Sequence, residues 1–149
     1  MLLGADVSHP PPGNQTRPSL ATLVGSIDRC ATRYVATARN QTHREEVIEG
    51  LDSMVKSCTE SYMSFQSFHK AQNAVPETII YFRDGVSEGQ FGKVLDEELP
   101  QIRKGLAQLN IPAEQAEAIR ITVCIVRYVR HVAGLMTESG TILASSRRR

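Results

Sequence analysis

The segment Thr78–Phe82 is an almost uninterrupted apolar run of β-branched and aromatic residues, and it stops at Arg83–Gly85. Such a run is typical of a central strand that is covered on both faces of a sheet. Ser87 and Gln90 follow with the spacing of a capping box, which indicates that a helix starts directly behind the strand. A strand, a glycine turn and a helix in direct succession favour an α/β fold.

Hydrophobic periodicity predicts the elements on either side of this strand. Short apolar runs joined by polar connections indicate strands, and apolar residues at spacings of three and four indicate helices. The expected elements are strands over Leu2–Val7, Leu20–Ile27 and Arg33–Ala38, a helix over Val47–Phe68, a helix over Phe91–Leu109 that Pro100 should kink or split, and a strand over Ile121–Val126. The order β-β-β-α-β-α-β predicts an antiparallel meander and two helical crossovers, hence a mixed sheet flanked by helices.

Size, charge and cysteine content narrow the class of protein. The chain has 149 residues, about the size of one domain, and a formal net charge of +1, so any binding of nucleic acid must depend on local patches. The cysteines Cys30, Cys58 and Cys124 lie far apart, which gives no disulfide framework or zinc-ligand spacing and indicates a reducing compartment. Because no apolar run could span a bilayer and no signal-peptide pattern is present, we expect a soluble protein of the cytoplasm or nucleus, without a membrane partner.

Asp6 and Asp84 each end an expected strand. In α/β sheets, ligands bind beyond the carboxyl ends of the strands, and neighbouring strands lie about 4.8 Å apart, so both side chains can face one small site if their strands are neighbours. Two such carboxylates repel each other. A pair of divalent cations about 3.5–4 Å apart resolves the repulsion and is the usual apparatus of phosphodiester hydrolysis. From the spacing alone, a turn or N-cap aspartate at each place stays an open alternative.

Five segments of the chain read GADVSHPPPG, PSLATLVGSID, RYVAT, HREEVIEGL and YFRDGVSEGQF. In this order, over about residues 2–131, they resemble the Piwi domain of eukaryotic Argonaute proteins, and RDGVSEGQF is highly specific to that family. The resemblance implies a ribonuclease-H-like fold and guide-directed cleavage of RNA by two metal ions. It also implies a small guide RNA and a target RNA as partners, with proteins of the silencing complex as further candidates.

The resemblance implies an active-site tetrad of Asp-Glu-Asp-His, or Asp-Glu-Asp-Asp. By position, the first aspartate is Asp6, the glutamate of the family's mobile finger is Glu46, and the second aspartate is Asp84. Glu45 is an equally plausible carboxylate beside Glu46, and both precede an expected helix, where acids are favoured by the helix dipole. Asp6 and Asp84 are the expected metal ligands, for Mg²⁺ or Mn²⁺.

Other polar residues are weaker candidates. His9 could touch the site from the proline loop, although an ordinary loop histidine is the simpler interpretation. His43 and Arg44 either position the glutamate, contact backbone phosphate, or form a solvated helix start. Arg83 should point to the face opposite Asp84, because neighbouring residues of a strand alternate. The remaining basic candidates are expected on a solvated helix face: Lys93, Arg103 and Lys104.

The resemblance ends after the fifth expected strand. Where the family continues with a Gln-Lys-Arg-His-His-type segment, this chain has RYVRH, residues 127–131, and then a stretch rich in Gly, Ser and Thr. We therefore expect a partial Piwi domain over residues 1–131, incomplete at its C-terminal end, and a disordered tail over residues 132–149. His131 aligns with a different family histidine and is not the fourth member of the tetrad.

Three functional interpretations stay open. The first is a nucleic-acid-binding Piwi fragment of an Argonaute-like protein of RNA silencing. It would be related to guided, Mg²⁺-dependent RNA cleavage but not competent alone, because three of four tetrad positions are present and two-metal catalysis needs a complete shell. The second is a free-standing ribonuclease-H-like nuclease. The third is a non-enzymatic Piwi remnant that binds RNA or protein.

Overall fold

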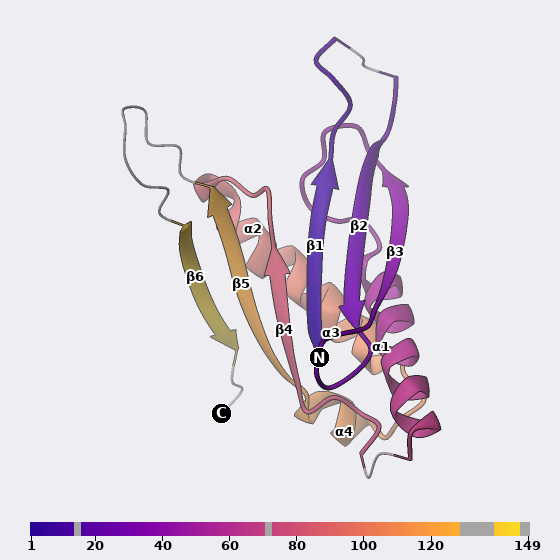
Figure 1. Ribbon diagram of the computed structural model, residues 1–149. Helices are drawn as coiled ribbons and strands as arrows, with labels where there is room; N and C mark the ends of the chain where they lie inside the picture. Colours follow the sequence, from indigo (N-terminus) through magenta and orange to yellow (C-terminus); the bar gives the residue numbers. More distant parts are fainter. Residues whose placement is uncertain (14–15, 71–72, 129–138, 147–149) are drawn as a thin grey trace.

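One mixed sheet forms the centre of the molecule, and all of the labelled helices lie against the same face of it (Figure 1). The computed structural model describes residues 1–13, 16–70, 73–128 and 139–146. The strand order is β3-β2-β1-β4-β5-β6. β1 pairs antiparallel with β2 and parallel with β4, while β5 pairs parallel with β4 and antiparallel with β6. The strands are β1 Leu2–Ser8, β2 Ser19–Ser26, β3 Tyr34–Gln41, β4 Thr78–Arg83, β5 Arg120–Tyr128 and β6 Ser139–Ser146.

Alternation along the strands places the core between the sheet and the helices. In β1, Leu3, Ala5 and Val7 are buried, and the antiparallel register sets Ala5 opposite the buried Leu23 of β2. The buried residues of β4 and β5 line the same core: Ile79, Tyr81, Ile121, Val123 and Ile125. The sheet therefore presents one packed face, as period-two burial requires.

The helix α1, Leu51–Phe68, covers part of this face. Its buried apolar side chains recur at spacings of three and four: Leu51, Met54, Val55, Cys58 and Tyr62. Against it packs α3, Leu99–Ala107, which buries Ile102 and Leu106. Gly105 permits the close approach of the two helices, because a Cβ there would lie 2.4 Å from the carbonyl oxygen of Asp52.

The second expected helix is divided into pieces. A 3₁₀ turn at Glu88–Gln90 leads into α2, Phe91–Lys93, a π-helical turn at Val94–Glu98, and then α3. Pro100 lies in the first turn of α3 and has no amide hydrogen to donate backward, so the predicted interruption is confirmed as a change of helix type. The predicted capping box forms only in part. The Ser87 amide donates to Gln90 Oε1 over 3.3 Å, but the Gln90 amide donates to the Ser87 carbonyl oxygen, over 2.9 Å, and not to its hydroxyl.

Several boundaries differ from the sequence-based expectation. α1 begins at Leu51 rather than Val47, because Gly50 takes a left-handed conformation with φ of 66°, although Val47 and Ile48 are still buried. A short helix, α4 at Ala113–Ala118, was not predicted. The segment expected to be a disordered tail contains β6, whose backbone pairs with β5. The boundary at residue 131 stays a prediction, because residues 129–138 lie outside the described part of the chain.

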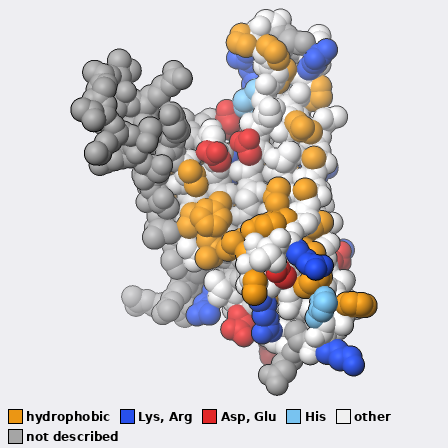
Figure 2. All heavy atoms as spheres, in the orientation of Figure 1, with side chains coloured by type: hydrophobic (Ala, Val, Ile, Leu, Met, Phe, Trp, Pro, Cys, Tyr) orange, Lys and Arg blue, Asp and Glu red, His pale blue; other side chains and the backbone are white. Residues whose placement is uncertain are grey.

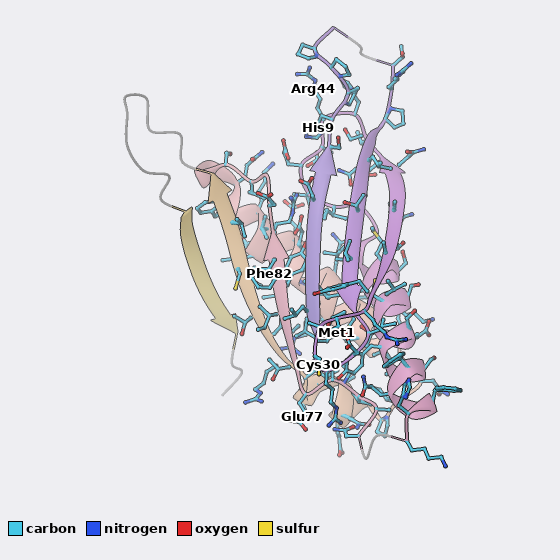
Figure 3. All side chains as sticks on the ribbon, viewed as in Figure 1. Met1, His9, Cys30, Arg44, Glu77 and Phe82 are labelled. Carbon is cyan, nitrogen blue, oxygen red and sulfur yellow. The ribbon has the colours of Figure 1, made fainter. Side chains whose placement is uncertain are left out.

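The opposite face of the sheet is open in the described part of the chain. Leu20, Val24 and Phe82 are 42%, 39% and 38% exposed there, so the expectation that β4 is covered on both faces is wrong within these residues. Figure 2 shows apolar side chains gathered over the middle of the sheet, and Phe82 is labelled in Figure 3. None of the described helices is long and apolar enough to cross a membrane.

Candidate active site

Asp6 and Asp84 lie side by side at the carboxyl ends of two parallel strands. The register pairs Ala5 of β1 with Arg83 of β4, and the Asp84 amide donates to the Ala5 carbonyl oxygen over 3.1 Å. Ala5 and Arg83 are buried and the two aspartates are exposed, as alternation predicts for side chains that share the open face. Figure 2 shows acidic side chains gathered near the ends of these strands.

Gly85 lets the chain turn away directly behind Asp84. Its φ is 80°, a region that favours glycine, and its amide donates to Asp84 Oδ1 over 2.8 Å. A Cβ at this position would lie 3.2 Å from Asp6 Oδ1. The glycine therefore leaves room for the Asp6 carboxylate as well as relieving the turn.

Glu46 reaches the same edge of the sheet from the connection between β3 and α1. Glu46 Oε1 lies 2.9 Å from His9 Nε2, and His9 Nδ1 lies 2.8 Å from the hydroxyl of the buried Ser19. The Arg44 amide also donates to the Ser19 hydroxyl, over 2.9 Å. Because a carboxylate accepts, His9 Nε2–H donates to Glu46, and the Ser19 hydroxyl, which can donate and accept at once, joins His9 Nδ1 to the Arg44 amide. His9 and Arg44 are both labelled beyond the end of β1 in Figure 3.

A buried ion pair lies beneath these carboxylates. Arg83 and Glu98 are both 0% exposed, and Arg83 Nε lies 3.0 Å from Glu98 Oε1. The remaining guanidinium nitrogens donate to main-chain oxygens, Nη1 to Asp84 and Nη2 to Glu46. Arg83 therefore points to the face opposite Asp84, as predicted, and touches the backbone of two site residues from below.

The Glu98 carboxylate is fully provided with donors. Besides Arg83, Oε1 accepts from the Ile48 amide over 3.1 Å and Oε2 accepts from the Tyr81 hydroxyl over 2.7 Å. Burial, and then the Glu98 carboxylate, raises the pKa of the Tyr81 phenol well above its ordinary value, so the hydroxyl keeps its proton and remains a donor. In the described part of the chain, no buried side-chain nitrogen or oxygen lacks a hydrogen-bond partner.

The site offers two carboxylates to a cation. Among residues that the structure describes, no group of three His, Cys, Asp or Glu side chains gathers around one point, since Glu46 turns to His9. Asp6 and Asp84 nonetheless fit Mg²⁺ by their chemistry, because this ion is commonly held by one or two carboxylates and completes its shell with waters and phosphate oxygens. Glu45 does not join them, as its Oε1 accepts locally from the Val47 amide over 3.3 Å.

The other candidates lie as follows. His43 Nδ1 donates to the Arg17 carbonyl oxygen over 2.8 Å, while Lys93 is exposed, as predicted. Lys104 is exposed as well, as predicted, but pairs with Asp52, whereas Arg103 is only partly exposed. Lys104 Nζ lies 2.7 Å from Asp52 of α1, and Arg103 Nη1 donates to the Ile119 carbonyl oxygen over 2.7 Å. His131 lies outside the described residues.

Sequence reasoning missed the role of Glu98 and undervalued His9. The signal for Glu98 was present, since Val94, Glu98 and Ile102 share one helix face at spacings of four, which puts a carboxylate on a face that is otherwise apolar. Likewise, the period-two pattern of Ile79, Tyr81 and Arg83 points a guanidinium into the core. A charged residue at a core position on each of two facing elements indicates a buried pair.

Comparison with known proteins assigns the family. The model of the Piwi domain matches residues 1–133. This chain belongs to the Piwi domain family. The ribonuclease-H-like fold expected for a Piwi domain is confirmed by the mixed sheet with its helices and by the solved structures that it resembles.

The relatives of this Piwi domain are Argonaute proteins. It is 50% identical over 111 residues to protein argonaute 7 of Arabidopsis thaliana, and 40% identical over 133 residues to protein argonaute 3 of Oryza sativa subsp. japonica. These matches cover 74% and 88% of this chain but 11% of each relative. The chain therefore spans about a tenth of the length of the curated relatives that it matches.

Solved structures resemble it over most of its length. The C-terminal lobe of a budding yeast Argonaute superposes with a TM-score of 0.71 at 27% identity, over 87% of this chain and 25% of that one. Kluyveromyces polysporus Argonaute, solved with a guide RNA, gives a TM-score of 0.65 at 26% identity, over 85% of this chain and 14% of that one.

Proposed function

We propose that this Piwi domain supplies the RNA-cleaving part of an Argonaute-type protein, in which a small guide RNA directs the cut in a target RNA. The observation that carries the proposal is the placement of Asp6 and Asp84 at the ends of adjacent parallel strands, joined by the bond from the Asp84 amide to the Ala5 carbonyl oxygen. Two exposed carboxylates at such an edge are the arrangement that phosphodiester chemistry requires.

Each residue has a distinct role in the proposed reaction. Asp6 and Asp84 hold Mg²⁺ or Mn²⁺ on the open face of the sheet, where an RNA backbone has access. Glu46 completes the acidic group from the β3–α1 connection, and His9 orients its carboxylate. Cations bound by Asp6 and Asp84 would supply Lewis-acid chemistry, namely polarisation of the phosphodiester and activation of the attacking water.

The guide and target supply sequence recognition by base pairing, so the protein needs to contact only their shape and backbone. A net charge of +1 agrees with this division, because the chain has no broad basic field of its own. The Kluyveromyces polysporus Argonaute that this chain resembles was solved with a guide RNA, which supports the same class of partner here.

We further propose that the isolated chain binds the cation but does not cut. Three of the family's four tetrad positions can be assigned in it, as Asp6, Glu46 and Asp84. Two-metal catalysis needs a complete and rigid set of ligands, so a missing fourth ligand abolishes cleavage while leaving weak metal binding. Calorimetric titration should show millimolar affinity for Mn²⁺, and Asp84→Ala should remove that binding.

A transplant tests the catalytic assignment. Residues 2–126 would replace the equivalent segment of an active Argonaute, which supplies the fourth ligand and the guide-binding domains. We expect the chimera to cut a matched RNA. Asp6→Asn, Glu46→Gln and Asp84→Asn should each abolish cutting but leave target binding nearly intact, because pairing and backbone contacts supply most of the affinity.

Glu45→Gln is the matched control, since its carboxylate bonds only to the nearby Val47 amide. This variant should cut almost normally. If the folded chimera binds guide and target but never cuts, the domain is a non-enzymatic remnant. Guide-independent cutting by the isolated chain would instead support a free-standing nuclease.

A further inference from the structure

The geometry points to Glu98 as a positioning residue of the proposed active site: through Arg83 and the Ile48 amide, its buried carboxylate sets where Asp84 and the segment carrying Glu46 lie. The inference rests on the proposed function, because it gives these carboxylates a task. Glu98 itself lies below the site and touches none of the three proposed catalytic side chains.

Two segments of the proposed site meet at the ion pair of Arg83 and Glu98, namely the segment that carries Glu46 and the end of β4. Glu98 Oε1 accepts from Ile48, two residues beyond Glu46, while Arg83 donates to the Glu46 carbonyl oxygen. The same guanidinium donates to the Asp84 carbonyl oxygen. The two ions of the pair thus hold the glutamate-bearing segment at two points and the end of β4 at a third.

Glu98 is itself held in a fixed position. It is the last residue of the π-helical turn Val94–Glu98, and its other oxygen accepts from Tyr81 on β4 over 2.7 Å. Gln101, one turn further along, also braces the segment: Nε2 donates to the Ile48 carbonyl oxygen over 3.1 Å and Oε1 accepts from the Leu51 amide over 3.0 Å. The connection between β3 and α1 is therefore held by side chains of the helical layer and not by the main-chain hydrogen bonds of a sheet.

The free-energy cost of burying Arg83 and Glu98 also favours a positioning role for the pair. Taking two charges out of water is costly, and replacing a buried ion pair with apolar residues of similar volume is often neutral or stabilising. Stability of the fold is therefore a poor reason for keeping Arg83 and Glu98. A directional network with defined hydrogen-bond geometry, in contrast, places a main-chain segment more accurately than apolar contacts do. The pair is explained by the accuracy with which it positions the main chain that carries Glu46 and Asp84.

The test uses the bond between His9 and Glu46 as a reporter, because that contact forms only if the Glu46 segment lies in place. Long-range ¹H–¹⁵N spectra of the full 149-residue chain report the protonated nitrogen of His9 and its hydrogen bond. Glu46→Gln identifies the signal. The key variant is Arg83→Met with Glu98→Leu, which removes both charges and keeps the volume.

We expect the double variant to melt at the same temperature as the parent or higher, yet to lose the His9 signature. Its Mn²⁺ affinity should fall about tenfold or more, as for other residues that orient metal ligands. Glu98→Gln, which keeps the shape, should weaken the same signature. Lys104→Met is the matched control, because it removes the ion pair of the exposed Lys104 on α3 with Asp52 on α1 without touching the 46–48 segment.

A folded double variant with an unchanged His9 signature would overturn the inference. So would the unfolding of both the double variant and Glu98→Gln, because the pair would then determine the fold rather than the site. Failure of the proposed function has a different result. In that case the signature depends on Glu98 as expected, but the chain binds no Mn²⁺ and the transplanted segment does not cut.

Discussion

The carboxylates of the candidate site reach one edge of the sheet by two different means. Asp6 and Asp84 project from hydrogen-bonded strands, and their separation follows from the register of β1 with β4. Glu46 projects from an irregular connection, and its place depends on side chains: His9 on its carboxylate, Arg83 on its carbonyl oxygen, and Glu98 on the amide two residues later.

The difference shows what each half of the site can tolerate. A pair set by register changes only if the strands slip, and a slip by one residue would turn every buried side chain of β1 to the open face. A segment set by side chains can be released by one substitution, without any change in the sheet. The main chain that carries the aspartates should therefore tolerate substitutions around it better than the segment that carries Glu46 does.

The largest expected effect comes from removing one ion of the buried pair. Arg83→Met leaves the Glu98 carboxylate buried and without its charged partner. Loss of one member of such a pair costs about 3–5 kcal/mol. The free energy of unfolding, measured by urea titration with circular dichroism, should fall by an amount of that order.

Lys56→Met provides the comparison on the surface. Lys56 lies 3.9 Å from Glu60 on α1, and both side chains are well exposed. Exposed pairs of this spacing contribute about 0.3–0.5 kcal/mol, so this variant should unfold almost as the parent does. Equal losses in the two variants would show that the Arg83–Glu98 pair has no special weight in the fold.

Most of the fold could be predicted from the sequence, because local patterns decide it. The period-two runs gave the first three strands to within a few residues, and the long apolar periodicity gave α1 and the broken second helix. α4 was missed because AEQAEA has no apolar periodicity. β6 was missed because its segment, SGTILASS, is dominated by small and polar residues that are poor strand signals.

The candidate site likewise has one part that could be predicted from the sequence and one part that could not. The adjacency of Asp6 and Asp84 follows from the strand order, which places β4 beside β1. Periodicity does not determine that order, so the sequence alone predicts the adjacency only on the condition that the two strands are neighbours. The contacts that place the Glu46 segment could not be predicted, because they join residues far apart in the sequence. His9 and Glu46 are 37 positions apart, and Ile48 and Glu98 are 50 positions apart. Periodicity only marks Glu98 as a charge on an apolar helix face.

A smaller effect is expected at Gly85, on the side of the site that the sheet controls. Gly85→Ala puts a side chain where φ is 80°, which costs about 1–2 kcal/mol. Its Cβ would also lie 3.2 Å from Asp6 Oδ1, so the carboxylate must shift. Urea titration should show the loss of stability, and calorimetry should show weaker binding of Mn²⁺.

Gly89→Ala is the control for this substitution. Gly89 lies in the 3₁₀ turn after the site, and a Cβ there would meet no atom within 4 Å. Metal binding should be unchanged in Gly89→Ala. If Gly85→Ala binds Mn²⁺ as the parent does, the close approach of Gly85 to Asp6 does not shape the site.

The smallest expected effect concerns the ion pair between Lys104 of α3 and Asp52 of α1. The hydrogen bond from Lys104 lowers the pKa of Asp52 below its usual value. A carboxylate whose pKa is lower in the folded state stabilises the protein above its unfolded pKa, about 3.9, and loses that contribution as the pH falls through the lower, folded value. Since Lys104 is 68% exposed, the contribution should not exceed about 1 kcal/mol near neutral pH.

Asp52→Asn should therefore unfold slightly more easily than the parent at pH 7, and the difference should disappear in strong acid. Lys104→Met should reproduce the loss, and the double variant should lose no more than either single one, because both substitutions remove the same bond. If the difference between Asp52→Asn and the parent is the same in acid as at pH 7, the ion pair between Lys104 and Asp52 does not contribute to the stability of the fold.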